Sequence, residues 1–123
     1  MKRDMDLVRK ILFALEEHPH GYPPDKLNIE GYDEETIGYH VLLMIEAGLL
    51  EGREDNVLGI DRNSPSAIPE RLTWLGHDFL DASRDPSRWE EARGIFSKLG
   101  GVTIDVAMKV LTEILARQAQ TLM

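Results

Sequence analysis

The sequence predicts an α+β fold that is mainly helical, with one small β-hairpin and additional helices towards its C-terminal end. Its 123 residues suit one domain with an extension, and a hydrophobic content of 42% is enough to build a core. Apolar side chains recur at three- and four-residue spacing in five segments, as amphipathic helices require. Residues 51–72, in contrast, carry many turn residues between two strand-like stretches, which predicts a hairpin.

The N-terminal part is predicted to be a helix followed by a short strand. Leucine, valine and isoleucine recur at helical spacing over residues 4–18. Asp4 or Asp6 caps the start of this helix, because a carboxylate accepts hydrogen bonds from free backbone N–H groups there. Pro19 ends it, since proline disfavours helical geometry at the preceding residue. Residues 22–32 begin with prolines and then alternate apolar with polar side chains, which predicts a short strand.

Residues 33–47 form the clearest predicted helix. Asp33 is the expected N-cap, and two glutamates follow in the first turn, where the helix dipole favours acidic groups. Gly48 is expected to end the helix in the left-handed backbone conformation.

Three further helices are expected after the hairpin. They cover residues 74–83, which follow a Thr73 cap, residues 87–99, and a last helix from its Thr103 cap to about residue 121. Aromatic residues lie at helical spacing in the first two of these helices, and we expect them in the core. These residues are Trp74, Phe79, Trp89 and Phe96.

The predicted order of elements is that of a winged-helix, helix-turn-helix-like domain, in which the hairpin is the wing and the preceding helix is the candidate DNA reader. Residues 39–50, with Ala-Gly-Leu-Leu at 47–50, resemble the end of the recognition helix in arsenic-repressor and multiple-antibiotic-resistance regulators. Residues 72–76 resemble the Leu-Thr-x-x-Gly run that follows the wing in many winged-helix proteins. We therefore divide the chain into a winged-helix domain, residues 1–83, and a C-terminal helical extension, residues 84–123, that packs on it or on a second chain.

The whole chain is similar to a bacterial and phage family that has only a descriptive name, domain of unknown function 2513. The resemblance covers nearly the full length, and it rests on residues 1–7, 39–49, 72–81 and 99–102. It implies a winged-helix fold and an association with prophages, and it implies no known reaction. The chain differs from the regulators at one place. Residues 22–32 are predicted to form a strand, whereas the fold of the regulators has a positioning helix there.

The net charge of −8, from 14 Lys+Arg and 22 Asp+Glu, is concentrated around the reader helix and the wing. Residues 21–83 hold 4 basic and 13 acidic residues, a net charge of −9. Residues 33–47 contain no Lys, Arg, Asn or Gln, the side chains that most often read DNA bases. If DNA is bound, the predicted contacts are Thr36, Tyr39, His40, Arg53 and Arg62. We expect His40 to be exposed and either to contact a base or to hydrogen-bond an acid from the wing.

Signatures of catalysis are absent from the sequence. It has no cysteine, which excludes a disulfide scaffold, a thiolate metal site and a cysteine nucleophile. It has no Gly-x-Ser-x-Gly, phosphate-loop or Rossmann glycine motif. Adjacent glutamates point about 100° apart on a helix and do not converge. The four histidines do not form the set of three or four ligands that a metal needs, so we expect no enzyme activity, cofactor or metal.

The last helix carries a longer apolar stripe than the cap of a small domain requires. Its members are Ile104, Met108, Leu111, Leu115 and Leu122. Such helices often pair with a counterpart in a second chain, so we expect a protein partner or a homodimer. No signal-like segment and no run of about 20 apolar residues is present, so a cytoplasmic location without membrane contact is expected. The sequence favours a non-enzymatic protein-interaction module of bacterial or prophage origin, with a small dimeric DNA-binding transcriptional regulator as the alternative.

Overall fold

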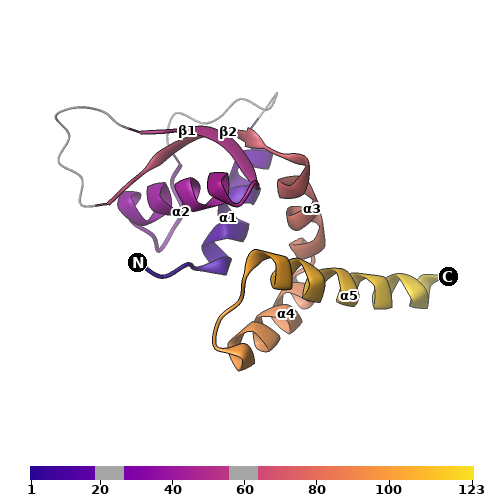
Figure 1. The fold of residues 1–123 in the computed structure, drawn as a ribbon. Helices are drawn as coiled ribbons and strands as arrows, with labels where there is room; N and C mark the ends of the chain where they lie inside the picture. Colours follow the sequence, from indigo (N-terminus) through magenta and orange to yellow (C-terminus); the bar gives the residue numbers. More distant parts are fainter. Residues whose placement is uncertain (19–26, 56–63) are drawn as a thin grey trace. The chain divides into compact units, whose positions relative to one another are not determined.

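The computed structural model describes residues 1–18, 27–55 and 64–123, whose elements are drawn in Figure 1. These residues form five helices and one two-stranded antiparallel sheet, which confirms the predicted mainly helical α+β class. The elements are α1 (Met5–Glu17), α2 (Glu34–Glu46), β1 (Leu50–Glu54), β2 (Ala67–Leu72), α3 (Trp74–Ser83), α4 (Pro86–Leu99) and α5 (Ile104–Leu122). The chain divides within α3 into two compact units, Met1–His77 and Asp78–Met123, and the division predicted from the sequence lies after residue 83.

Helix α1 begins at an aspartate cap and buries one apolar stripe. The Asp4 carboxylate accepts hydrogen bonds from the backbone N–H groups of Asp6 and Leu7 at 3.0 and 3.2 Å, so Asp4 is the cap. The stripe follows the predicted helical spacing. Its buried members are Leu7, Val8, Ile11, Leu12 and Leu15.

Helix α2 begins at the predicted cap, since Asp33 accepts a hydrogen bond from the backbone N–H of Thr36 at 2.8 Å. Hydrogen bonds from the side chain and the backbone of Thr36 lower the pKa of Asp33 below its ordinary value. Gly48 follows the helix with a φ of +81°, as predicted for a left-handed ending. In the first unit, α2 packs against α1 and against both strands of the hairpin (Figure 1).

The hairpin pairs β1 and β2 from Leu50 opposite Leu72 to Glu54 opposite Ala67, with an irregularity between Glu51 and Gly52. This pairing confirms the strands predicted on either side of the turn-rich segment. The strand predicted at residues 22–32 is wrong for its described part, because residues 27–32 contain no strand and include a turn that the Tyr32 N–H closes on the carbonyl of Ile29. Gly31, at a φ of +88°, bends the chain there, away from the extended geometry of a strand. Residues 22–26 lie outside the described part.

Thr73 joins the hairpin to α3 through both its backbone and its side chain. Its N–H donates to the carbonyl of Leu49 at 3.0 Å, and its hydroxyl donates to the carbonyl of Gly48 at 2.5 Å. The same hydroxyl accepts from the N–H of Gly76 at 3.1 Å, which confirms the predicted cap. A Cβ on Gly76 would lie 2.1 Å from the carbonyl oxygen of Leu49, so only glycine fits. The Leu-Thr-x-x-Gly run therefore has a local structural cause.

Trp74 corrects one expectation, since 83% of it is exposed although we placed it in the core. The reason is helix phase: Gly76, Phe79 and Ser83 are buried, and their directions lie about opposite that of Trp74 at 100° per residue. Its aromatic character suggested a core residue, and its place on the helix decides otherwise.

The second unit packs α4 and α5 together around the other three aromatic residues. Trp89 contacts Phe79 and Phe96 edge to face, with ring centroids 6.4 and 5.9 Å apart, and all three rings are buried as predicted. Asp85 caps α4 and the predicted Thr103 caps α5. The remaining buried apolar residues of this unit are Leu80, Ala82, Ala92, Ala107, Leu111 and Ile114.

Candidate functional site

The residues predicted to contact nucleic acid do not form one exposed group. Thr36 and Tyr39 are half-buried in α2, and Arg53 is exposed on β1. Arg62 lies outside the described residues. His40 is only 1% exposed, which corrects the expectation that it lies on the outer side of the helix. Its side chain points instead to the start of α1.

His40 uses both ring nitrogens in hydrogen bonds within the first unit. Nδ1 lies 2.9 Å from the carbonyl oxygen of Thr36, and Nε2 lies 2.9 Å from the backbone nitrogen of Asp4. A carbonyl can only accept and a backbone N–H can only donate, so the ring is neutral with its proton on Nδ1. Nε2 of His40 therefore accepts its hydrogen bond from the backbone N–H of Asp4, and its partner is not the acid of the wing that one of the two expectations named.

Asp4 extends this contact to the segment before α2. The Tyr32 hydroxyl donates to the second carboxylate oxygen of Asp4 at 2.8 Å. The ammonium of Lys10 in turn lies 5.5 Å from the centroid of the Tyr32 ring. Together with His40, these three residues join the start of α1 to α2 and to the segment just before α2. Sequence reasoning missed this group because no local spacing encodes it.

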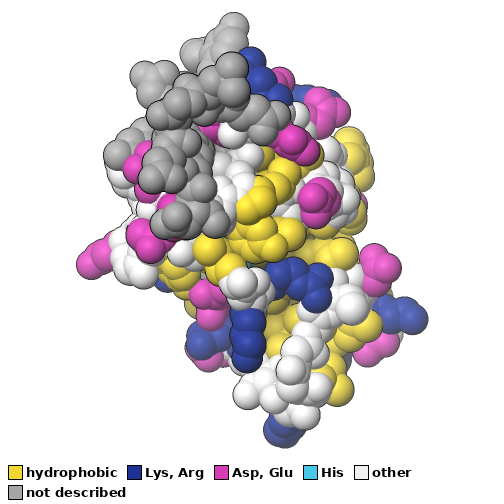
Figure 2. Space-filling model, turned by 60° about the vertical axis from the view of Figure 1, so that its left-hand side comes forward, with side chains coloured by type: hydrophobic (Ala, Val, Ile, Leu, Met, Phe, Trp, Pro, Cys, Tyr) yellow, Lys and Arg dark blue, Asp and Glu magenta, His cyan; other side chains and the backbone are white. Residues whose placement is uncertain are grey.

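The exposed surface around α2 is acidic. Residues 27–50 contain five acidic side chains, all exposed, and no Lys or Arg. They are Glu30, Asp33, Glu34, Glu35 and Glu46. On the side of the molecule shown in Figure 2, acidic side chains appear at several separate places. The candidate reader helix therefore presents a negative surface.

The described part of the hairpin adds little positive charge to this surface. Arg71 on β2 forms an exposed ion pair with Glu51 on β1 at 2.8 Å. Arg53 is flanked on its strand by the exposed Glu54. A duplex approaching these residues would meet carboxylates beside each guanidinium.

The predicted dimer stripe of α5 is divided between the interior and the surface of the second unit. Leu111 is fully buried, together with Ala107 and Ile114. Ile104 and Met108 are half-buried. Leu115 and Leu122 are 38% and 88% exposed. The ordinary core of the unit thus accounts for Leu111, and the surface part of the stripe is smaller than predicted.

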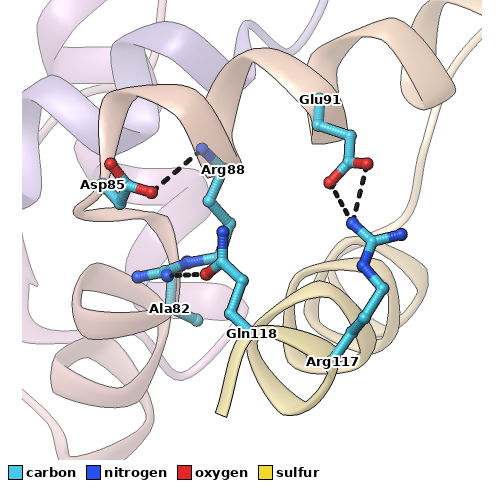
Figure 3. A network of polar contacts seen from close by, with 6 residues as sticks. All are labelled: Ala82, Asp85, Arg88, Glu91, Arg117 and Gln118. Carbon is cyan, nitrogen blue, oxygen red and sulfur yellow. Dashed lines mark hydrogen bonds and ion pairs between the residues drawn. The ribbon is translucent and has the colours of Figure 1, made fainter. Parts of the chain in front are cut away.

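A buried arginine connects α3, α4 and α5 in the second unit (Figure 3). The Arg88 guanidinium donates to the carbonyl oxygens of Ala82 and Asp81 at 2.6 and 3.2 Å, and to the side-chain oxygen of Gln118 at 2.6 Å. Its charge lies at the C-terminal end of α3, where the helix dipole is favourable to cations. Sequence reasoning did not single out Arg88, and its spacing from Gln118 offered no signal.

A second, exposed contact joins the same two helices. Arg117 on α5 forms an ion pair with Glu91 on α4 at 2.6 Å, and the hydrogen bond that the guanidinium donates to this carboxylate raises the pKa of Arg117 (Figure 3). Both side chains are largely in water, so the pair adds less to stability than Arg88 does.

Within residues 1–18, 27–55 and 64–123, no three His, Cys, Asp or Glu side chains are arranged to hold a metal ion. Over the same residues, no helix has the length and apolar character needed to cross a membrane.

A family model and a relative each match most of the chain. The family model described as "Hypothetical protein (DUF2513)" matches residues 2–103, which end at the cap of α5. An uncharacterized protein from Haemophilus influenzae is 36% identical over 124 residues, covering 94% of this chain and 100% of that protein. No solved structure matches the chain. The chain belongs to the DUF2513 family.

Proposed function

We propose that this chain is a non-enzymatic protein-interaction module of bacterial or prophage origin, with a winged-helix organisation in which the β1–β2 hairpin is the wing. The observation that carries the proposal is the exposed chemistry of α2. This helix precedes the hairpin, as a reader helix would, yet its surroundings from residue 27 to residue 50 carry five exposed acids and no base.

The charge argument separates protein binding from DNA binding. Each carboxylate placed near a phosphate in water costs about 1 kcal/mol, and more where water is excluded. Non-specific DNA affinity comes from Lys and Arg that neutralise phosphates, and α2 has none to offer. An acidic helix does not oppose a protein partner, because protein surfaces carry charges of both signs.

A second copy of the chain is the first partner to test, through the exposed end of α5. Leu115 and Leu122 are the two exposed members of the predicted stripe. We expect the double change Leu115→Glu and Leu122→Glu to raise the dimer dissociation constant at least about tenfold, because it places charge in an apolar contact. Sedimentation equilibrium of the full chain measures this effect.

A matched control adds the same two charges elsewhere on α5. Ala116 and Gln120 are exposed and point away from Leu115 and Leu122 around the helix, so Ala116→Glu with Gln120→Glu should leave self-association unchanged. A parent chain that is monomeric at all concentrations rejects α5 as a dimer surface. Equal weakening by both double variants would also reject it, since the effect would then come from net charge alone.

The alternative is a small dimeric DNA-binding transcriptional regulator. It is supported by the order of α2 and the hairpin and by the exposed Arg53. In this alternative the acids limit affinity, so Glu34→Lys with Glu35→Lys should strengthen a measurable binding of the parent to duplex DNA. Under our proposal the parent does not bind, and any binding by the variant is a new property created by the added lysines.

A further inference from the structure

We propose that His40 is a pH-sensitive latch, which holds the segment before α1 onto α2 when neutral and releases it when protonated. This device does not depend on the proposed function. It rests on the burial of the ring and on the direction of its two hydrogen bonds.

The latch has a defined hydrogen-bonding state. The Nδ1–H of His40 donates to the carbonyl of Thr36, and the lone pair of Nε2 accepts the backbone N–H of Asp4. With 1% exposure, the ring has no water that can substitute for either partner. If the proton moved from Nδ1 to Nε2, the lone pair of Nδ1 would face the carbonyl oxygen of Thr36. The new Nε2–H would face the N–H of Asp4, so neither hydrogen bond could form.

Protonation breaks the contact with Asp4 for a simple reason. Nε2 gains a hydrogen, which then points at the N–H of Asp4 across 2.9 Å. Two donors cannot share this distance, and the new positive charge is buried. The segment relaxes by moving the Asp4 backbone away from the ring.

The Asp4 carboxylate is the charged group that opposes this release, because it attracts an imidazolium. Its oxygens already accept from the amides of Asp6 and Leu7 and from the Tyr32 hydroxyl. To reach Nε2–H, the carboxylate must leave the helix cap, so a new ion pair would also open the start of α1. Both responses to protonation therefore disturb the same segment.

The other elements packed on α2 contribute as follows. From α1, the Lys10 ammonium lies against Tyr32 and adds positive charge near Asp4, which disfavours a second cation. The hairpin reaches α2 where Ser66 meets Gly38 and Gly52 meets Ile45. The remaining charged side chains of these elements are Asp6, Arg9, Glu16 and Glu17 on α1, Asp33, Glu34, Glu35 and Glu46 at the ends of α2, and Glu51, Arg53, Glu54, Asp55, Glu70 and Arg71 on or beside the strands.

Nuclear magnetic resonance of the full chain tests the latch. Long-range ¹H–¹⁵N spectra should show the Nδ1–H tautomer of His40 at pH 7.5. As the pH falls to 5.5, the protection factor of the Asp4 amide, corrected for intrinsic exchange, should fall at least about tenfold with the same midpoint as the His40 ring. Amides in the middle of α1 should keep their protection.

Two results would overturn the proposal in the parent chain alone. They are an Nε2–H tautomer at neutral pH, or an Asp4 protection factor that stays constant as the pH falls from 7.5 to 5.5. In the variants, His40→Gln should remove the pH dependence of Asp4 protection. His77→Asn, which changes an exposed histidine, should leave it intact. If His77→Asn abolishes the transition, His40 is not the latch.

Discussion

Arg88 offers the sharpest test of how the second unit is held together. The change Arg88→Met keeps a long apolar stem and removes the guanidinium. It leaves the carbonyl oxygens of Asp81 and Ala82 and the side-chain oxygen of Gln118 without their donor. Since only 9% of Arg88 is exposed, water does not readily replace it.

The expected loss follows from these contacts. A hydrogen bond with a charged partner contributes about 1.5–3 kcal/mol, but bonds in one network do not add. Burying the guanidinium also costs several kcal/mol, which offsets part of the gain. We therefore expect Arg88→Met to lower the free energy of unfolding by about 3 kcal/mol. Arg88→Lys keeps the charge but loses the forked geometry, so its loss should be about half as large.

The assay uses the buried tryptophan of the second unit as its probe. The chain has two tryptophans, and Trp74→Phe removes the exposed one, leaving Trp89 between Phe79 and Phe96. Urea unfolding followed by Trp89 fluorescence then reports on this unit. If the free energy of unfolding of Arg88→Met lies within about 0.5 kcal/mol of the parent value, the role assigned to Arg88 is refuted.

Two further predictions concern glycine fit and the cap of α2. Gly76→Ala should destabilise the first unit by about 2 kcal/mol or more in urea unfolding, because its Cβ would lie 2.1 Å from a backbone oxygen. At Gly94, within α4, an added Cβ would meet open space, so Gly94→Ala should raise the free energy of unfolding of the second unit by about 0.5–1 kcal/mol. A destabilising result would show that this position is not open. The pKa of Asp33 is lower in the folded state than in the unfolded chain. Its ionised carboxylate therefore stabilises the fold at a pH above the ordinary carboxyl pKa, and this stabilisation is lost as the pH falls through the pKa of the folded state. Asp33→Asn should keep the cap and remove that acid dependence from the pH profile of unfolding, and an unchanged profile would show that Asp33 is not its source.

Features set by neighbouring residues could be predicted from the sequence. The caps at Asp33, Thr73 and Thr103 and the left-handed Gly48 depend on side chains and backbone within a few residues, and all were predicted correctly. The exposed acidity of α2 could also be predicted, because it depends on composition more than on packing.

Contacts between distant residues could not be predicted. His40 was placed on the outer side of α2, yet its partner Asp4 lies 36 residues away and draws it inside. Arg88 and Gln118 are 30 residues apart, and their contact depends on how α4 and α5 pack. Trp74 shows a different error, because its type was given more weight than its direction on the helix. The contacts of His40 and Arg88 require tertiary structure, whereas the correctly predicted caps require about one turn of chain.

The central claim, that the acidic α2 serves a protein partner and not nucleic acid, is tested most directly by titrating labelled random duplex DNA with the full chain at about 50 mM salt and following fluorescence anisotropy. Electrostatic association is strongest under these conditions, and non-specific binders have dissociation constants of about 10⁻⁴–10⁻⁶ M even at physiological salt. We predict no rise in anisotropy up to about 100 μM protein. A saturable rise that weakens with added salt and is lost on Arg53→Glu would contradict the claim and support the DNA-binding alternative.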